Sequence, residues 1–96
     1  MKRFRELENQ IIPVLAPYGV KRVALFGSVV RAEDTARSDV DILVEFKAPV
    51  GLFRLARMQR ELEERLERPV DLVTEGFLSR YMRPYIEEEQ VVLYEE

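Results

Sequence analysis

The stretch that decides the fold is Gly27-Ser28-Val29-Val30-Arg31-Ala32-Glu33-Asp34-Thr35-Ala36-Arg37-Ser38-Asp39-Val40-Asp41. It begins with a Gly-Ser turn that follows one apolar run. It ends with two carboxylates, separated by a single residue, where the next apolar run begins. A third carboxylate, Asp71, lies inside the short apolar run 69–73. A turn suited to phosphate and carboxylates suited to a hard cation together indicate a site for a magnesium-bound nucleotide.

Around this stretch, the sequence alternates between helical and strand patterns. Period-two alternation and β-branched residues predict four strands, at 20–26, 39–46, 69–74 and 91–94. Helical patterns predict four helices, at 4–15, 29–33, 52–66 and 77–89, the last with a break near Pro84. Pro13 should bend or shorten the first helix, Ser28 should cap the second, and Leu52 should lie on the apolar side of the third. Such alternation predicts an α/β (α+β) fold in which helices pack against one sheet.

The composition narrows the chemistry. A chain of 96 residues predicts a single domain over 1–96, with no membrane span and, by default, a cytoplasmic location. The net charge of −3 makes nucleic acid an unlikely partner. The chain has no Cys and no His, which excludes disulfides, zinc sites and Ser-His or Cys-His catalysis. Any metal must therefore be held by oxygen, which favours Mg²⁺.

The three aspartates fit phosphoryl transfer. Side chains two residues apart on a strand point to the same face, so Asp39 and Asp41 can reach one pair of metal ions. Asp71, on a neighbouring strand, supplies a third ligand or acts as a base toward an attacking hydroxyl. The alternative is that all three are ordinary exposed strand or turn residues. Their position in or beside apolar β runs argues against this, because a covered carboxylate is costly without a positive partner.

The Gly-Ser turn has its own logic. Gly27 lets a phosphate approach the backbone, and Ser28 adds free N–H groups and a hydroxyl, although a Gly-Ser pair alone is a common turn. Arg31 lies about one turn later and either contacts phosphate or pairs at the surface. The acidic residues at 87–89 and 95–96 are expected only to keep the C-terminus soluble, with contact to a basic partner as the alternative.

Gly-Ser, ten residues, Asp-x-Asp and a later Asp on another strand form a pattern that resembles the minimal nucleotidyltransferase (MNT) family of the DNA polymerase β-like superfamily. The resemblance implies a small mixed sheet flanked by helices and ATP as donor. It also implies that Gly27 and Ser28 touch the nucleotide phosphates, while Asp39, Asp41 and Asp71 bind two Mg²⁺ ions. Family members often have Ala-Arg-Gly where this chain has Val30-Arg31-Ala32.

Resemblance to the family further implies pairing with a HEPN-type toxin, for which the MNT protein is the antitoxin and, in some members, adenylylates a tyrosine. The short chain leaves no room for an acceptor domain, so the acceptor should come from another protein or a second copy of this one. The alternatives are a non-catalytic antitoxin and an enzyme for small molecules such as aminoglycosides. Most of the tail tyrosines, Tyr81, Tyr85 and Tyr94, are expected in the core rather than at a partner contact.

Overall fold

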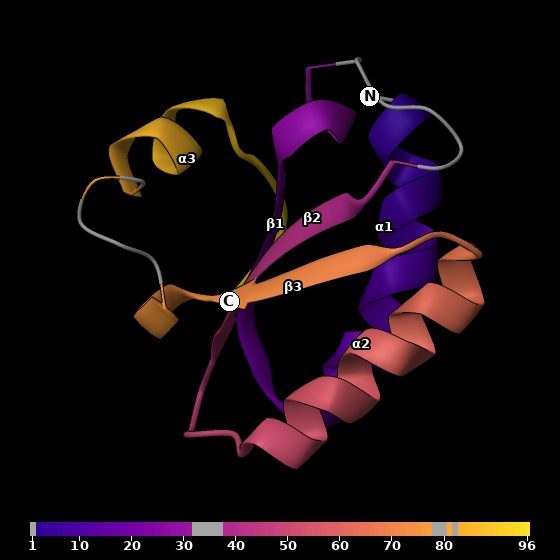
Figure 1. The fold of residues 1–96 in the computed structure, drawn as a ribbon, viewed down its shortest axis with the longest axis vertical. Helices are drawn as coiled ribbons and strands as arrows, with labels where there is room; N and C mark the ends of the chain where they lie inside the picture. Colours follow the sequence, from indigo (N-terminus) through magenta and orange to yellow (C-terminus); the bar gives the residue numbers. More distant parts are fainter. Residues whose placement is uncertain (1, 32–37, 78–80, 82) are drawn as a thin grey trace.

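The computed structural model describes residues 2–31, 38–77, 81 and 83–96 (Figure 1). Its helices are α1 (Lys2–Leu15), α2 (Leu52–Leu66) and α3 (Arg83–Glu89). Its strands are β1 (Val20–Phe26), β2 (Val40–Phe46), β3 (Val70–Thr74) and β4 (Val91–Glu95). Three short 3₁₀ turns follow α1, β1 and β3: η1 (Ala16–Tyr18), η2 (Gly27–Val29) and η3 (Glu75–Phe77). The four predicted strands are thus confirmed to within one residue at either end.

The four strands form one mixed sheet in the order β3-β2-β1-β4. β1 runs antiparallel to both β2 and β4, whereas β2 and β3 are parallel. A parallel pair needs a long crossover, and α2 provides it. The parallel register places Asp41 beside Asp71, and the N–H of Val40 donates to the carbonyl of Pro69 at 2.9 Å. The starts of β2 and β3 are therefore held next to each other.

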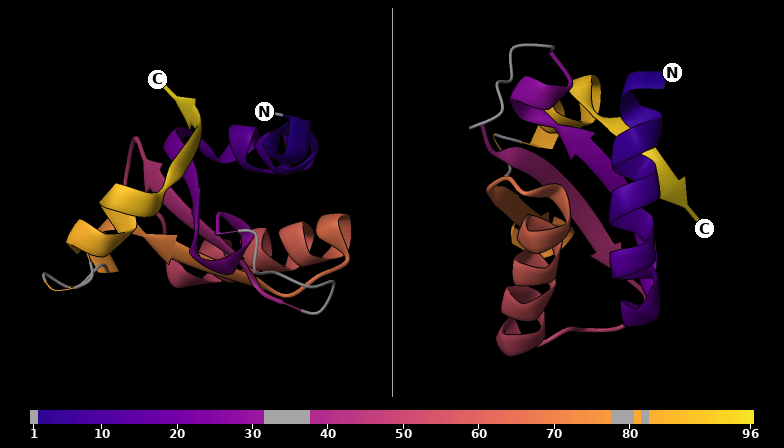
Figure 2. Two further views of the ribbon diagram at one scale, coloured as in Figure 1. Left: turned by 90° about the horizontal axis from the view of Figure 1, so that it is seen from above. Right: turned by 90° about the vertical axis from the view of Figure 1, so that its right-hand side faces the viewer.

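Helices cover both faces of this sheet, as Figures 1 and 2 show, with α1 and α2 on one side and α3 on the other. The larger core packs Ile11 and Leu15 of α1 and Met58 and Leu62 of α2 against Val23, Leu25, Ile42 and Val44. The smaller core joins Ala24, Phe26 and Leu43 to Ile86 of α3. Alternate residues of β1 and β2 thus enter opposite cores, as a period of two requires. Within the described residues, no helix is long and apolar enough to cross a membrane.

Several local expectations differ from the structure. α1 continues through Pro13 to Leu15 before it tightens into a 3₁₀ turn. Ser28 does not cap a helix: it lies within η2, which has no side-chain cap, because the turn begins one residue earlier at Gly27. Leu52 is exposed, since the first turn of α2 extends beyond the core. Residues 32–37 lie outside the described residues, so the predicted end of the second helix is among them.

The C-terminal part of the chain corrects two further predictions. Tyr81, Tyr85 and Tyr94 are exposed rather than buried. In α3 it is Ile86, next to Tyr85, that enters the core. The terminal acidic residues do more than keep the protein soluble. Glu95 pairs with Arg22 at 2.8 Å and Glu96 pairs with Lys47 at 2.6 Å, so these ion pairs tie the end of the chain to the sheet.

Candidate functional site

Asp41 is the centre of the candidate site. It is the second residue of β2, and its sheet partners are Phe26 at the end of β1 and Asp71 near the start of β3. Its neighbours Val40 and Ile42 are fully buried in the larger core, so Asp41 faces the opposite side of the sheet. On that side it shares a face with Leu43, which packs against α3. This explains why a carboxylate on an otherwise apolar strand is only half-buried.

Gly27 follows β1 and lies directly against Asp41. Its φ of 77° is in the left-handed region that favours glycine. A Cβ atom at this position would overlap the Oδ2 atom of the Asp41 carboxylate. Gly27 is thus required both by its backbone conformation and by the approach of the carboxylate. The Gly-Ser turn and the Asp-x-Asp pair, far apart in the sequence, meet here.

The electrostatic potential around Asp41 is strongly negative. Burial, the largest cause, and the negative charges of Asp71, Asp39 and Glu89 together raise the pKa of Asp41 from 3.8 to about 6. Arg31 acts in the opposite direction and lowers the pKa. Carboxylates that repel one another in this way favour the binding of a cation, which would relieve the repulsion.

The side chains around Asp41 are of a chemical type that binds a hard cation. The groups that surround Asp41 include the carboxylates of Asp39, Asp71 and Glu89 beside the single guanidinium of Arg31, and Asp39 and Asp71 are exposed. Across residues 2–31, 38–77, 81 and 83–96, no group of three or more acidic side chains is arranged to hold a metal ion. Asp39, Asp41 and Asp71 are neighbours of a type suited to a hard cation, but they are not already arranged as a metal site, so their role as ligands stays a prediction.

The turn after β1 is held by an unforeseen residue. The Gly27 carbonyl accepts hydrogen bonds from the N–H groups of Val30 at 3.1 Å and Arg31 at 3.3 Å. The Gly27 N–H donates to Oε1 of Glu89 at 2.8 Å. The Nη1 atom of Arg31 lies 3.0 Å from both carboxylate oxygens of Glu89. The surface pairing considered for Arg31 is therefore present, and its partner is Glu89.

Of the six residues predicted for the site, the structure brings Gly27, Arg31, Asp41 and Asp71 into one neighbourhood. Asp39 lies two residues before Asp41 just outside β2, and the half-buried Ser28 lies within η2. Sequence reasoning missed Glu89, which it counted among solubilising acidic residues. A signal was present: Glu89 follows the apolar residue Ile86 by three positions and so lies on the same side of the helix.

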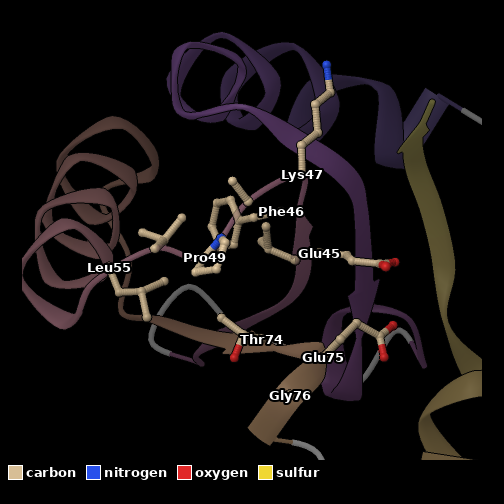
Figure 3. Close-up of a pocket in the computed structure, with 11 residues that line it drawn as sticks. Glu45, Phe46, Lys47, Pro49, Leu55, Thr74, Glu75 and Gly76 are labelled. Atoms are coloured by element: carbon tan, nitrogen blue, oxygen red, sulfur yellow. The ribbon is translucent and has the colours of Figure 1, made fainter.

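A separate cavity of about 410 Å³ lies at the other ends of β2 and β3 (Figure 3). Phe46, Pro49, Leu55 and Thr74 line it, and Glu45 and Glu75 border it. In Figure 3 the apolar side chains gather between β2 and α2, while Lys47 points away. Because the aspartates lie at the starts of these parallel strands, the cavity and the carboxylate site are distinct.

Comparisons with known proteins agree with this geometry. A family model described as a nucleotidyltransferase domain matches residues 8–94. A protein of Methanocaldococcus jannaschii, provisionally assigned as a protein adenylyltransferase, is 42% identical over 86 residues, which are 90% of this chain and 92% of that protein.

Two solved structures share the fold. One, described as a candidate minimal nucleotidyltransferase, is 33% identical, covers 94% of this chain and 92% of its own, and has a TM-score of 0.80. The other is an MNT antitoxin in complex with a tri-AMPylated Shewanella oneidensis HEPN toxin. It is 22% identical, covers 96% of this chain and 72% of its own, and has a TM-score of 0.77. At that identity, the second likeness shows the fold alone.

Proposed function

Because the chain belongs to the minimal nucleotidyltransferase family, we propose that it is a Mg²⁺-dependent adenylyltransferase that moves AMP from ATP to a tyrosine hydroxyl of a HEPN-type toxin, and so acts as its antitoxin. The observation that carries the proposal is the contact between Gly27 and Asp41. It joins a turn suited to phosphate to a carboxylate suited to a metal ion, with Asp71 alongside.

Each residue has a role in the proposed reaction. Gly27 lets the phosphates of ATP approach the turn, where Ser28 binds them, while Asp39, Asp41 and Asp71 would hold the metal ions. The acceptor oxygen forms a bond to the α-phosphorus, the bond to the bridging oxygen breaks, and pyrophosphate leaves. Asp71 takes the proton of the hydroxyl. Mg²⁺, when bound, would neutralise the charge on the phosphates.

The acceptor is proposed to come from the partner. The cavity beside Leu55 lies at the opposite ends of β2 and β3 from the aspartates, so it is not placed to present an acceptor to them. Exposed aromatic side chains offer contact surface instead: Phe53 is 94% exposed, and Tyr81 and Tyr85 are also exposed. The same exposed surface would serve a non-catalytic antitoxin, which neutralises its toxin by binding alone.

The two functions are separated by one experiment. The protein is incubated with Mg²⁺, ATP labelled on the α-phosphate and a candidate HEPN-type toxin, beside the double variant Asp39→Ala/Asp41→Ala. We expect label on the toxin, located to a tyrosine by mass spectrometry, and none with the variant. A variant that forms the complex and neutralises the toxin as well as wild type, with no label in either case, would establish the binding module instead. Label on added small acceptors without toxin would indicate a small-molecule enzyme.

A further inference from the structure

One carboxylate joins the two ends of the turn that follows β1. Glu89 accepts the N–H of Gly27, the first residue of η2, and also holds the guanidinium of Arg31, four residues later. Inside the turn, the Gly27 carbonyl accepts from the backbone N–H groups of Val30 and Arg31. The backbone thus closes the turn from within, and Glu89 fixes it from outside.

Glu89 is itself well anchored. It is the last residue of α3, and Ile86, one turn earlier, is buried in the smaller core with Phe26 and Leu43. The next residue, Gln90, donates its N–H to the Ile86 carbonyl and its side chain accepts from Arg22 of β1. The chain then enters β4, which pairs with β1. The carboxylate is therefore carried on a short helix that is attached at both ends of its last turn.

The hydrogen bonds decide which groups remain for a ligand. The Gly27 N–H is already used by Glu89, and Nη1 of Arg31 is directed to the same carboxylate. Among the described residues, the Ser28 hydroxyl has no hydrogen-bond partner, and Ser28 is half-buried at the surface of the site. The turn therefore offers Ser28 to an anion, while Gly27 and Arg31 maintain its shape.

We propose that Glu89 is a positioning residue. Its carboxylate links Gly27 to Arg31, an arrangement called the clip below, and thereby holds the phosphate-binding turn in the shape that ATP requires. The inference rests on the proposed function and deepens it. Arg31 then acts through Glu89 rather than as the main phosphate contact. A charge-assisted hydrogen bond to a backbone N–H is among the stronger ones available, so a single carboxylate is enough for this role.

The test uses three variants of the full chain. Glu89→Ala removes the clip. Glu89→Gln keeps an oxygen that accepts the Gly27 N–H but removes the ion pair with Arg31. Glu88→Ala is the matched control, because Glu88 is an exposed neighbour on the same helix. Two quantities are measured: the amide signal of Gly27 by ¹⁵N NMR with hydrogen exchange, and the affinity for ATP with Mg²⁺ by calorimetry.

We expect Glu89→Ala to shift the Gly27 amide signal, speed its exchange and weaken ATP binding by about tenfold. Glu89→Gln should restore most of the Gly27 protection and about half of the lost binding free energy, whereas Glu88→Ala should match wild type. In the transfer reaction, the loss in Glu89→Ala should appear mainly as a higher KM for ATP, since the turn holds the triphosphate before and during the reaction.

Two results would overturn the inference. Tighter ATP binding by Glu89→Ala or Glu89→Gln would show that the carboxylate competes with phosphate for the turn. An unchanged Gly27 signal with normal ATP binding would show that the clip has no role. A wild-type protein that binds no ATP would instead contradict the proposed function, while the Gly27 signal still reports whether the clip exists. Because Glu89→Gln retains the shape of the side chain, it keeps the test valid if Glu89→Ala unfolds.

Discussion

Two separate constraints require glycine at position 27, and the energetic cost of violating each can be measured separately. Its φ is positive, and a Cβ would overlap Asp41 Oδ2. Gly19 has a nearly identical φ of 75°, but a Cβ there would meet nothing within 4 Å. We predict that Gly19→Ala lowers the free energy of unfolding by about 1–2 kcal/mol through backbone strain alone. Gly27→Ala should cost about 2–4 kcal/mol, because steric overlap is added to the strain.

Urea unfolding of both variants checks this, with Gly76→Ala as control, since its Cβ would also meet open space and its φ lies outside the left-handed region. ATP binding should be lost in Gly27→Ala and retained in Gly19→Ala. Equal costs for the two left-handed glycines would mean that Asp41 moves away freely. The close packing of the Asp41 carboxylate on the turn would then contribute nothing to the free energy of unfolding.

Asp41 gives the metal-free protein a distinctive pH dependence. Its pKa is about 6 in the folded chain and 3.8 in the unfolded reference, so between these values the folded state binds the additional proton. The contribution of Asp41 to stability is therefore greatest below pH 3.8 and falls as the pH rises through 6. We predict that Asp41→Asn is more stable than wild type at pH 7.5 in EDTA, and that this advantage shrinks toward pH 4.

Urea unfolding of wild type and Asp41→Asn at a series of pH values provides the measurement, and Glu88→Gln controls for the loss of one exposed charge. The difference between wild type and Asp41→Asn is the relevant quantity, because other carboxylates titrate in the same range. A constant difference across this pH range would refute the raised pKa. Adding Mg²⁺ should stabilise wild type more at pH 7.5 than at pH 5, since protons compete with the cation for Asp41.

At the level of elements, α3 connects the smaller core to the site. Ile86 is 4% exposed and packs with Phe26 and Leu43, whereas its neighbour Tyr85 is 76% exposed. We predict that Ile86→Ala destabilises the protein by about 2–3 kcal/mol and also weakens ATP binding, because Glu89 loses its anchored position. Tyr85→Ala should change stability by less than about 0.5 kcal/mol.

Hydrogen exchange of α3 and β4, together with ATP titration, measures both effects of Ile86→Ala. Should stability fall while ATP affinity stays at the wild-type value, the site would be independent of α3. The conservative Ile86→Val, which removes one methylene, should cost about 0.5–1.5 kcal/mol and leave ATP affinity near normal.

The elements show how far the sequence alone could lead. β2 was predictable because Val40, Ile42 and Val44 alternate with Asp39 and Asp41, and period-two alternation defines both the strand and the face of each side chain. The boundaries of the turn after β1 were not predictable. Ser28 is a good cap by type, but the close approach of Asp41 to Gly27 depends on β1 pairing with β2, a contact that local pattern does not encode.

The role of Glu89 was signalled in the sequence only by its spacing from Ile86, and that signal depends on the packing of Ile86. Three consecutive glutamates at 87–89 look alike in the sequence. The burial of Ile86 fixes the rotation of α3, and with it which glutamate faces the turn. The tyrosines follow the same logic: Tyr81 and Tyr85 are aromatic, but they lie on the side of this segment that faces solvent. Tertiary packing, rather than residue type, decided each case.

For the whole molecule, ligand binding and folding should be tightly linked, because the site is built from four elements. It lies at the ends of β1 and α3 and at the starts of β2 and β3. Mg²⁺ with ATP at 100 times the dissociation constant should add about 2.7 kcal/mol to the free energy of unfolding. For a chain of this size, that corresponds to a rise in Tm of about 10–20 °C.

Differential scanning fluorimetry with Mg²⁺, with ATP and with both measures this rise in Tm, and Asp39→Ala/Asp41→Ala is the control. Only the combination should give the full shift, since the carboxylates need the cation before they can approach the phosphates. An equal shift with ATP in EDTA would show that the turn binds the nucleotide without metal, and would separate the phosphate site from the aspartates.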